Sequence, residues 1–248
     1  MNWNVIQSVL TGTSHFKSNT PCQDSIAFFN ENDSCTIALA DGAGSAQLSG
    51  IGSRLSCKAV IKLMKTEFDN LKVKDDYQIQ LKIIHSIRTS LGITAKKREQ
   101  SKEDFASTLL FVSIKEDNII IGHIGDGVIG GICKDGTLEL LSMPENGEYA
   151  NMTYFTTSDN YKLHFRIKRA KLDKYKAFFL MSDGAAECLY HKKNQSFAPA
   201  ISAFSSWIDK YSIEDVNNAL FDNMKSKFPL HTNDDCSFIM CQQDNQPT

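Results

Sequence analysis

The sequence predicts an α+β fold in which two antiparallel β-sheets pack face to face and pairs of helices cover their outer faces. Strand-like and helix-like segments occur in separate blocks along the chain, which disfavours the strict strand–helix alternation of a parallel sheet. Several of the strand-like segments are apolar along their whole length, so they need apolar cover on both faces. A four-layer α/β/β/α sandwich meets both requirements.

The first block contains three strands followed by two helices. Residues 3–10 and 25–29 have strand character, and residues 34–40, SCTIALA, are apolar enough to be buried on both faces. From 46 to 68 the apolar residues recur three to five positions apart, which is typical of an amphipathic helix. Residues 76–98 carry isoleucine or leucine at four-residue spacing, which predicts a second helix.

The middle of the chain predicts a meander of antiparallel strands joined by short polar turns. These strands are expected at 105–114, 118–124, 128–133 and 137–141. Residues 143–161 fit neither a helical nor a strand period. Because long irregular segments in compact domains are often functional, we expect this one to carry function.

Two further strands, two helices and a last strand are predicted to complete the fold. Strand character returns at 162–168 and 176–182 and again at 236–241. Apolar residues at helical spacing mark two helices between them, one with Ile201, Phe204, Ile208 and Tyr211 and one with Ile213, Val216, Leu220 and Met224. No repeat or linker divides the chain, so we predict a single domain over 1–248 with a flexible tail at 242–248.

The composition is that of a globular protein with a sizeable core, at 42% hydrophobic and 23% charged residues. The net charge of -2 gives no reason to expect a nucleic-acid or membrane partner. The seven cysteines are odd in number and lack CxxC spacing, which favours reduced thiols in a cytoplasmic protein. No signal peptide is recognisable, and no apolar run approaches the roughly 18 residues of a membrane span. We expect a cytoplasmic monomer.

Four Asp-Gly pairs stand out, and one of them differs from the rest. Asp135-Gly136 lies between two strand-like segments, where the pair typically forms a hairpin turn. The other three come at the ends of apolar strands, and their aspartates are Asp41, Asp126 and Asp183. The residues after Asp183-Gly184 are small and apolar and look helical, so a hairpin does not explain that pair.

Two more aspartates, Asp234 and Asp235, directly precede the last strand. A folded domain that gathers these strand ends at one rim brings several carboxylates together. Their mutual repulsion is tolerable where divalent cations lie between them. The pattern therefore predicts a metal site built from aspartates.

Five short motifs carry a resemblance to a known family. PCQDS, ALADGAGS, IGHIGDG, FLMSDGAAE and NDDCSFIM occur in this order over about residues 12–241. In order and spacing they resemble the motifs of the metal-dependent protein phosphatases of the PP2C type, in the form that bacterial members carry. Each motif alone is common, but the five in order are specific. The family fold is a β-sandwich of two antiparallel sheets flanked by helix pairs, which agrees with the layers inferred above.

The resemblance implies a dinuclear Mn²⁺ or Mg²⁺ centre with a weaker third ion. Asp41 would bridge the two principal metals, and the carbonyl of Gly42 would reach the second one. Asp183 and Asp234 would hold the first metal. For the last of these, Asp234 and Asp235 are both candidates, and alignment of Ser237 with the family's usual ending favours Asp234.

The same resemblance assigns two further aspartates. Asp126 would help to hold the third ion together with Asp183, and Asp24 would act through a metal-bound water or position the phosphate. Asp24, Asp41 and Asp183 are thus the candidate catalytic residues. Ser107 and Thr108, in the strand after the second helix, are expected to be structural.

Three positions depart from the family pattern. The usual phosphate-binding arginine is replaced by Asn19, and the glutamate before the first aspartate is Gln23. A cation for the substrate phosphate would then come from His15 or Lys17, although either is more often an ordinary surface residue. The histidine that many eukaryotic members carry after Asp-Gly is Ala43, so leaving-group protonation would fall to water or another group.

The predicted function is metal-dependent hydrolysis of phosphoserine and phosphothreonine in proteins, with the 143–161 segment as a flap near the site. An alternative is a catalytically weak pseudophosphatase that binds phosphoproteins, since the arginine and glutamate are missing. Retention of the aspartates argues against it, because a binding module has no need for a repelling carboxylate cluster. A metal-dependent nuclease is disfavoured because the sequence lacks the basic groove that nucleic acid requires.

Overall fold

The computed structural model describes residues 2–31, 33–145 and 153–244, and it confirms the predicted α+β sandwich. Two five-stranded sheets pack face to face, and every pair of neighbouring strands within them is antiparallel. The first sheet contains, in spatial order, β1 (Trp3–Leu10), β12 (Cys236–Gln243), β9 (Tyr175–Met181), β6 (Val128–Cys133) and β7 (Leu138–Ser142). The second contains β2 (Ser25–Glu31), β3 (Ser34–Ala40), β4 (Leu109–Lys115), β5 (Asn118–Ile124) and β8 (Arg166–Lys171).

Strand β3 shows why whole strands are apolar. Its alternate residues Cys35, Ile37 and Leu39 point into the apolar layer between the two sheets. Ala38 and Ala40 point the other way, into the layer between the second sheet and its helices. Because successive side chains of a strand face opposite sides, a strand with apolar layers on both sides must be apolar throughout.

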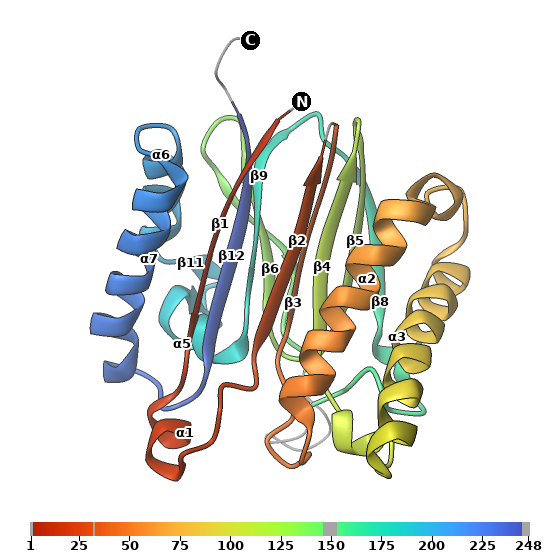
Figure 1. Cartoon of the computed structure of the whole chain (residues 1–248). Coiled ribbons are helices and arrows are strands. Elements are labelled where there is room, and N and C mark those ends of the chain that lie inside the picture. The colour runs from red at the N-terminus through yellow and green to blue at the C-terminus, as the bar shows by residue number, and fades with distance from the viewer. Residues whose placement is uncertain (1, 32, 146–152, 245–248) are drawn as a thin grey trace.

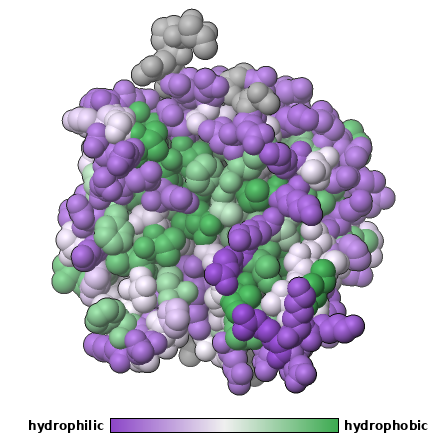
Figure 2. All heavy atoms as spheres, in the orientation of Figure 1, coloured by the Kyte–Doolittle hydropathy of each residue, from purple (hydrophilic) through white to green (hydrophobic). Residues whose placement is uncertain are grey.

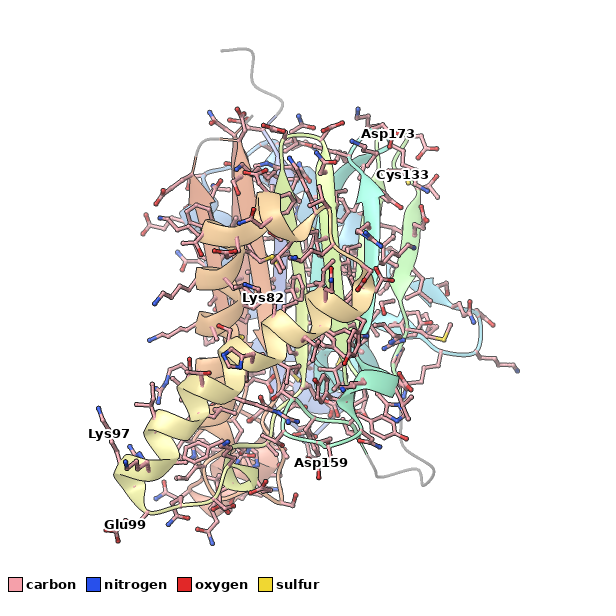
Figure 3. The ribbon with its side chains drawn as sticks, turned by 90° about the vertical axis from the view of Figure 1, so that its right-hand side faces the viewer. Lys82, Lys97, Glu99, Cys133, Asp159 and Asp173 are labelled. Carbon is pink, nitrogen blue, oxygen red and sulfur yellow. The ribbon has the colours of Figure 1, made fainter. Side chains whose placement is uncertain are left out.

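Two helix pairs form the outer layers (Figure 1). Helices α2 (Ser49–Leu71) and α3 (Asp76–Arg98) cover the second sheet, whereas α6 (Ala200–Ile208) and α7 (Ile213–Lys227) cover the first. On α3 the exposed Lys82 and Lys97 lie on the solvent side, as seen in Figure 3. Four layers and three apolar interfaces result.

Helix α3 begins and ends at the residues that the sequence predicts. The carboxylate of Asp75 accepts a hydrogen bond from the backbone N–H of Gln78 at 2.7 Å, which caps the first turn. The last turn carries three basic residues that complement the helix dipole, and Glu99 ends the helix in the left-handed region at φ 55°.

The segment around residues 162–168 differs from the predicted strand. Residues Tyr161–His164 form one helical turn, α4, and β8 begins only at Arg166. Leu163 is therefore 81% exposed instead of facing the core. The stretch predicted as strand from 105 begins as a 3₁₀ turn, Glu103–Phe105. The last strand continues to Gln243, two residues beyond its predicted end at 241 and into the predicted tail.

Apart from α4 and the turn at Glu103–Phe105, four short elements among the described residues were not predicted: α1 (Thr13–Ser18), β10 (Tyr190–His191), β11 (Ser196–Phe197) and a 3₁₀ turn at Phe228–Leu230. The helical character after Asp183 was predicted, and it forms α5 (Asp183–Leu189), but the extent of this helix was not predicted. Elements of this length contain too few residues for a periodicity to be visible in the sequence.

The side of the sandwich formed by β1 and β2 carries apolar side chains on its surface. Val9 on β1 and Phe28 on β2 are 37% and 44% exposed, and Phe221 on α7 is 40% exposed. Figure 2 shows hydrophobic side chains on this face, with hydrophilic ones around them. Both strands are the edges of their sheets, and the helix layers cover the sheet faces but not these edges.

Among the helices described, none combines the length and the apolar character that crossing a membrane requires. All seven cysteines are free thiols, and four of them are buried: Cys35, Cys57, Cys236 and Cys241.

Candidate active site

Three of the predicted aspartates meet at one end of the sandwich, the end that carries α1 and α5 in Figure 1. Asp41 follows β3, Asp126 follows β5, and Asp183 follows β9 and opens α5. Each offers a carboxylate oxygen, and these oxygens lie within 4.8 Å of one another. Strands from both sheets therefore contribute to a single acidic cluster.

Asp41 is held by its neighbour across the sheet end. Its backbone N–H donates to the hydroxyl of Thr108 at 2.8 Å, and its carbonyl accepts from the N–H of Thr108, also at 2.8 Å. Ser107 forms an isolated bridge with Gly42, and its hydroxyl lies 3.0 Å from that of Ser56. These contacts fit the structural role expected for Ser107 and Thr108.

Asp183 owes its position to the glycine next to it. Its carboxylate accepts a hydrogen bond from the N–H of Gly184 at 2.7 Å. A Cβ atom at Gly184 would lie 2.3 Å from the carbonyl oxygen of Asp235, so only glycine lets α5 approach this segment so closely. The dipeptide thus brings Asp183 next to the start of β12.

Asp234 and Asp235 have different environments. Asp235 is buried, and its carboxylate accepts from the N–H groups of Gly12 and Gln23, each at 2.7 Å. It also lies 2.9 Å from Nδ1 of His15. Asp234 is exposed and lines the cavity described below, outside the three-residue cluster. Asp235 therefore fastens the N-terminal segment to β12, whereas Asp234 faces the acidic site.

Asp24 lies beneath the cluster and is only 6% exposed. Neither of its carboxylate oxygens has a hydrogen-bond partner among the described residues. Burial is the main cause that raises the pKa of Asp24, to about 6. Asp24 does not line the acidic cavity but a second hollow beside Ser8 and Phe221. The side chains of Ser237, Asp41 and Ser182 oppose this rise in the pKa of Asp24, so the residue is placed in a polar environment next to the cluster.

The cluster opens into a cavity of about 650 Å³, which is within the usual size of a ligand site. Its walls are largely acidic or small side chains and glycines. The predicted site residues among them are His15, Asp41, Gly42, Asp126, Asp183 and Asp234. Lys17 is exposed on α1 and does not line this cavity, and Asn19 ends α1 in the left-handed region at φ 55°.

Burial raises the pKa of all three clustered carboxyl groups, and neighbouring carboxylates add to this rise. Burial is the larger cause for each, and it raises the pKa of Asp183 to about 7, with help from the charges of Asp126 and Asp234. The pKa of Asp41 is well above its ordinary value, with Asp24, Asp183 and Asp126 as the contributing charges. Burial also raises the pKa of Asp126, and the hydrogen bond from Thr153 opposes this rise.

The donor set fits a hard divalent cation. The three clustered groups are all carboxylates, and oxygen ligands are what Mg²⁺ and Mn²⁺ prefer. Among the residues that the structure describes, His15 provides the one imidazole of the cavity wall, and its Nδ1 lies 2.9 Å from the carboxylate of Asp235, which is outside the cluster. A cation bound here would remove the repulsion that raises these pKa values.

Several cavity residues were not predicted from the sequence, and three of them carry charged or hydrogen-bonding side chains next to the cluster. Thr153 donates a hydrogen bond to the carboxylate of Asp126, and it belongs to the irregular segment predicted to be functional. Glu187 lies four residues after Asp183 on α5, and this spacing places both side chains on one helix face. Its position next to the site could therefore have been predicted from the sequence. Lys192 lies in the turn between β10 and β11, where no local pattern marked it.

Comparison with known proteins agrees with this geometry. The profile of the family described as Protein phosphatase 2C matches residues 11–225, so the chain belongs to this family. Serine/threonine-protein phosphatase 3 of Escherichia coli (strain K12) is 32% identical over 165 residues, covering 64% of this chain. The match spans 65% of the length of that relative.

Solved structures share the fold. Serine/threonine phosphatase Stp1 from Staphylococcus aureus has a TM-score of 0.66 at 16% identity, covering 99% of this chain and 96% of its own. The catalytic domain of the serine/threonine protein phosphatase PstP, in complex with 2 manganese ions, has a TM-score of 0.64 at 14% identity, covering 98% and 99%. At these identities the likeness concerns the fold.

Proposed function

We propose that this protein is a metal-dependent phosphatase that hydrolyses phosphoserine and phosphothreonine monoesters in proteins. The observation that carries the proposal is the meeting of Asp41, Asp126 and Asp183 within 4.8 Å at the base of an open cavity, in a chain of the protein phosphatase 2C family. Phosphate monoesters hydrolyse extremely slowly in water, so such a site has to neutralise the phosphoryl charge and supply an activated water.

Two divalent cations, Mn²⁺ or Mg²⁺, would supply that chemistry by polarising a water and neutralising phosphoryl oxygens. We assign Asp41 and the carbonyl of Gly42 to the second metal, with Asp41 shared between both. Asp183 and Asp234 are assigned to the first metal, which the cavity-facing position of Asp234 supports. Asp126 is assigned to a weaker third ion together with Asp183.

The remaining residues hold this arrangement in place. Thr108 fixes the backbone of Asp41 by hydrogen bonds to both its N–H and its carbonyl group. Thr153 orients the carboxylate of Asp126. Asp24 is assigned to a metal-bound water or to positioning of the phosphate, and its buried position next to Asp41 supports this assignment. Ala43 has no ionisable group, so protonation of the leaving oxygen falls to water or another group.

Hydrolysis of an aryl phosphate tests the proposal. Turnover should require added Mn²⁺ or Mg²⁺, stop in EDTA and resume when the metal is restored. Asp41→Asn should abolish turnover, whereas the matched control Asp135→Asn, in the exposed hairpin, should leave it unchanged. Full turnover in EDTA would contradict the dinuclear assignment.

The alternative of a phosphoprotein-binding pseudophosphatase is favoured by Asn19 and Gln23, which replace the arginine and glutamate of the family pattern. A wild-type protein that binds a phosphothreonine peptide with Mn²⁺ present, but releases no phosphate from it, would establish this alternative.

A further inference from the structure

Lys192 is the one lysine or arginine that lines the acidic cavity among residues 2–31, 33–145 and 153–244. We propose that its ammonium group binds the phosphoryl group of the substrate, in the place of the arginine that the N-terminal motif lacks. The inference rests on the phosphatase function proposed above. It moves the phosphate-binding role away from Lys17, which lies outside the cavity, and from His15.

The hairpin that carries Lys192 is anchored to the core. β10 and β11 pair Tyr190 with Phe197, and their rings lie 5.3 Å apart. The ring of Phe197 also meets that of Phe179 on β9 edge to face, at 4.9 Å. The N–H of Ala198 donates to the carbonyl of Leu189 at 2.9 Å, which closes the base of the hairpin against the end of α5. The strand that precedes Lys192 is therefore anchored at the end of α5, the helix that Asp183 opens.

The ammonium group of Lys192 is near the cluster but is not engaged by it. Its charge acts on Asp126, where it opposes the rise in pKa that burial causes. Within the described part of the chain, Lys192 forms no ion pair or hydrogen bond, and its side chain is exposed. A cation with no partner at the mouth of an acidic cavity is free to meet an incoming anion.

Other cationic candidates near the cavity already have partners. Arg88 donates to the carbonyls of Thr156, Thr157 and Ser158 at 2.8 to 3.2 Å, and it does not line the cavity. Nδ1 of His15 lies 2.9 Å from the buried carboxylate of Asp235. Lys192 is thus the cation whose binding to a phosphoryl oxygen would break no existing contact.

The charge and shape of the lysine side chain determine the effects expected from substitutions at Lys192. An ammonium group binds phosphate as a compact point charge, without the two-pronged geometry of arginine. Loss of one charge-assisted hydrogen bond to a substrate corresponds to an effect of about 10- to 100-fold on binding. An arginine at the same position should retain much of the interaction, because it keeps the charge and adds reach.

The test compares Lys192→Ala, Lys192→Arg and the neighbouring control Lys193→Ala at saturating Mn²⁺. Lys193 is exposed in the same turn and does not line the cavity. Lys192→Ala should raise the KM for a phosphothreonine peptide and the inhibition constant of inorganic phosphate by about tenfold or more, with a smaller change in kcat. Lys193→Ala should change neither constant, and Lys192→Arg should restore most of both.

Two outcomes with an active wild type would overturn the inference and leave the phosphatase function standing. In one, Lys192→Ala and Lys193→Ala have the same KM and phosphate inhibition constant. In the other, Lys192→Ala shifts only the Mn²⁺ concentration needed for half-maximal turnover, which would make Lys192 a neutralising charge for the metal site. If the wild type has no turnover, calorimetric titration of the Mn²⁺-loaded protein with inorganic phosphate decides: equal affinity in wild type and Lys192→Ala would overturn the inference.

Discussion

The same dipeptide, Asp-Gly, has opposite roles at positions 183–184 and 135–136. Asp135-Gly136 turns a hairpin between β6 and β7, and Asp135 is exposed, accepting a hydrogen bond from the N–H of Thr137 at 2.9 Å. That backbone hydrogen bond lowers the pKa of Asp135. Asp183 joins a strand to a helix beside two other carboxyl groups, and burial raises its pKa to about 7.

The glycines differ as much as the aspartates. Gly136 has φ +91°, and an added Cβ would meet no atom within 4 Å, so the turn needs glycine for its backbone conformation. Gly184 is helical, and its Cβ would lie 2.3 Å from the carbonyl oxygen of Asp235, so this position needs glycine for space. The flanking elements, and not the dipeptide, therefore decide whether Asp-Gly forms a turn or belongs to the acidic cluster.

The largest expected difference is in catalysis. Asp183→Asn keeps the shape of the side chain but removes a negative charge from the cluster, so metal affinity and water activation should both fall. Turnover of an aryl phosphate at saturating Mn²⁺ should drop by several orders of magnitude, with the fold retained. Asp135→Asn should not change turnover. Undiminished activity in Asp183→Asn would remove this residue from the mechanism.

A second contrast separates the adjacent residues Asp234 and Asp235. Asp234→Asn should reduce turnover by at least about tenfold, since even residues that support metal ligands have effects of that size. Asp235→Asn should instead lower the free energy of unfolding by about 2–3 kcal/mol, because the amide cannot replace a carboxylate that accepts two backbone N–H groups. Urea denaturation and steady-state kinetics of both variants measure this. The reverse result would make Asp235 the metal ligand.

Alanine at the two glycines should have unequal effects on stability. Gly184→Ala introduces a contact with backbone atoms that cannot move freely, so we expect a loss of about 1–3 kcal/mol together with reduced metal affinity. Gly136→Ala has room for the methyl group but strains a left-handed residue, for a loss of about 1 kcal/mol. Urea unfolding in EDTA gives both values. A larger loss for Gly136→Ala would mean that α5 can shift to accept a side chain.

The smallest expected effect is on how the stability of the metal-free protein depends on pH. Because the pKa of Asp183 is raised from 3.8 to about 7, its carboxyl group is neutral in both folded and unfolded chains at low pH. As the pH rises from about 4 towards 7, the unfolded state ionises first, so the folded state loses stability. In EDTA, the Tm of Asp183→Asn relative to that of the wild type should therefore rise between about pH 4 and pH 7. If the Tm of Asp183→Asn minus that of the wild type stays constant or falls over this pH range, Asp183 is not repelled in the metal-free cluster.

Much of the fold was predictable because long elements carry repeated information. Helix α3 repeats its apolar residues over many turns and has a capping aspartate at its start, so both ends were found. The turn at Tyr161–His164 was missed because Leu163 and Phe165 alternate like a strand, although Leu163 points to solvent and Phe165 is buried. Over so few residues, only the tertiary contacts decide between helix and strand.

Some residues of the candidate site were likewise predictable from the sequence, and others were not. Asp41, Asp126 and Asp183 were predictable as a group because each comes directly after a buried apolar strand, and strand ends meet at the rim of a sandwich. The position of Lys192 in the cavity was not predictable, because it depends on how Tyr190 and Phe197 seat a short hairpin on the first sheet. The same limit applies to the N-terminal segment, which hydrogen bonds from Gly12 and Gln23 fix against Asp235.

Calorimetric titration with Mn²⁺ tests most directly the claim that the strand-end aspartates form a metal centre and the hairpin aspartate does not. Wild type and Asp135→Asn should bind at least two Mn²⁺ ions per chain with the same affinities, and Asp41→Asn should lose the tight binding. Equal Mn²⁺ binding by wild type and Asp41→Asn, with both correctly folded, would contradict the account.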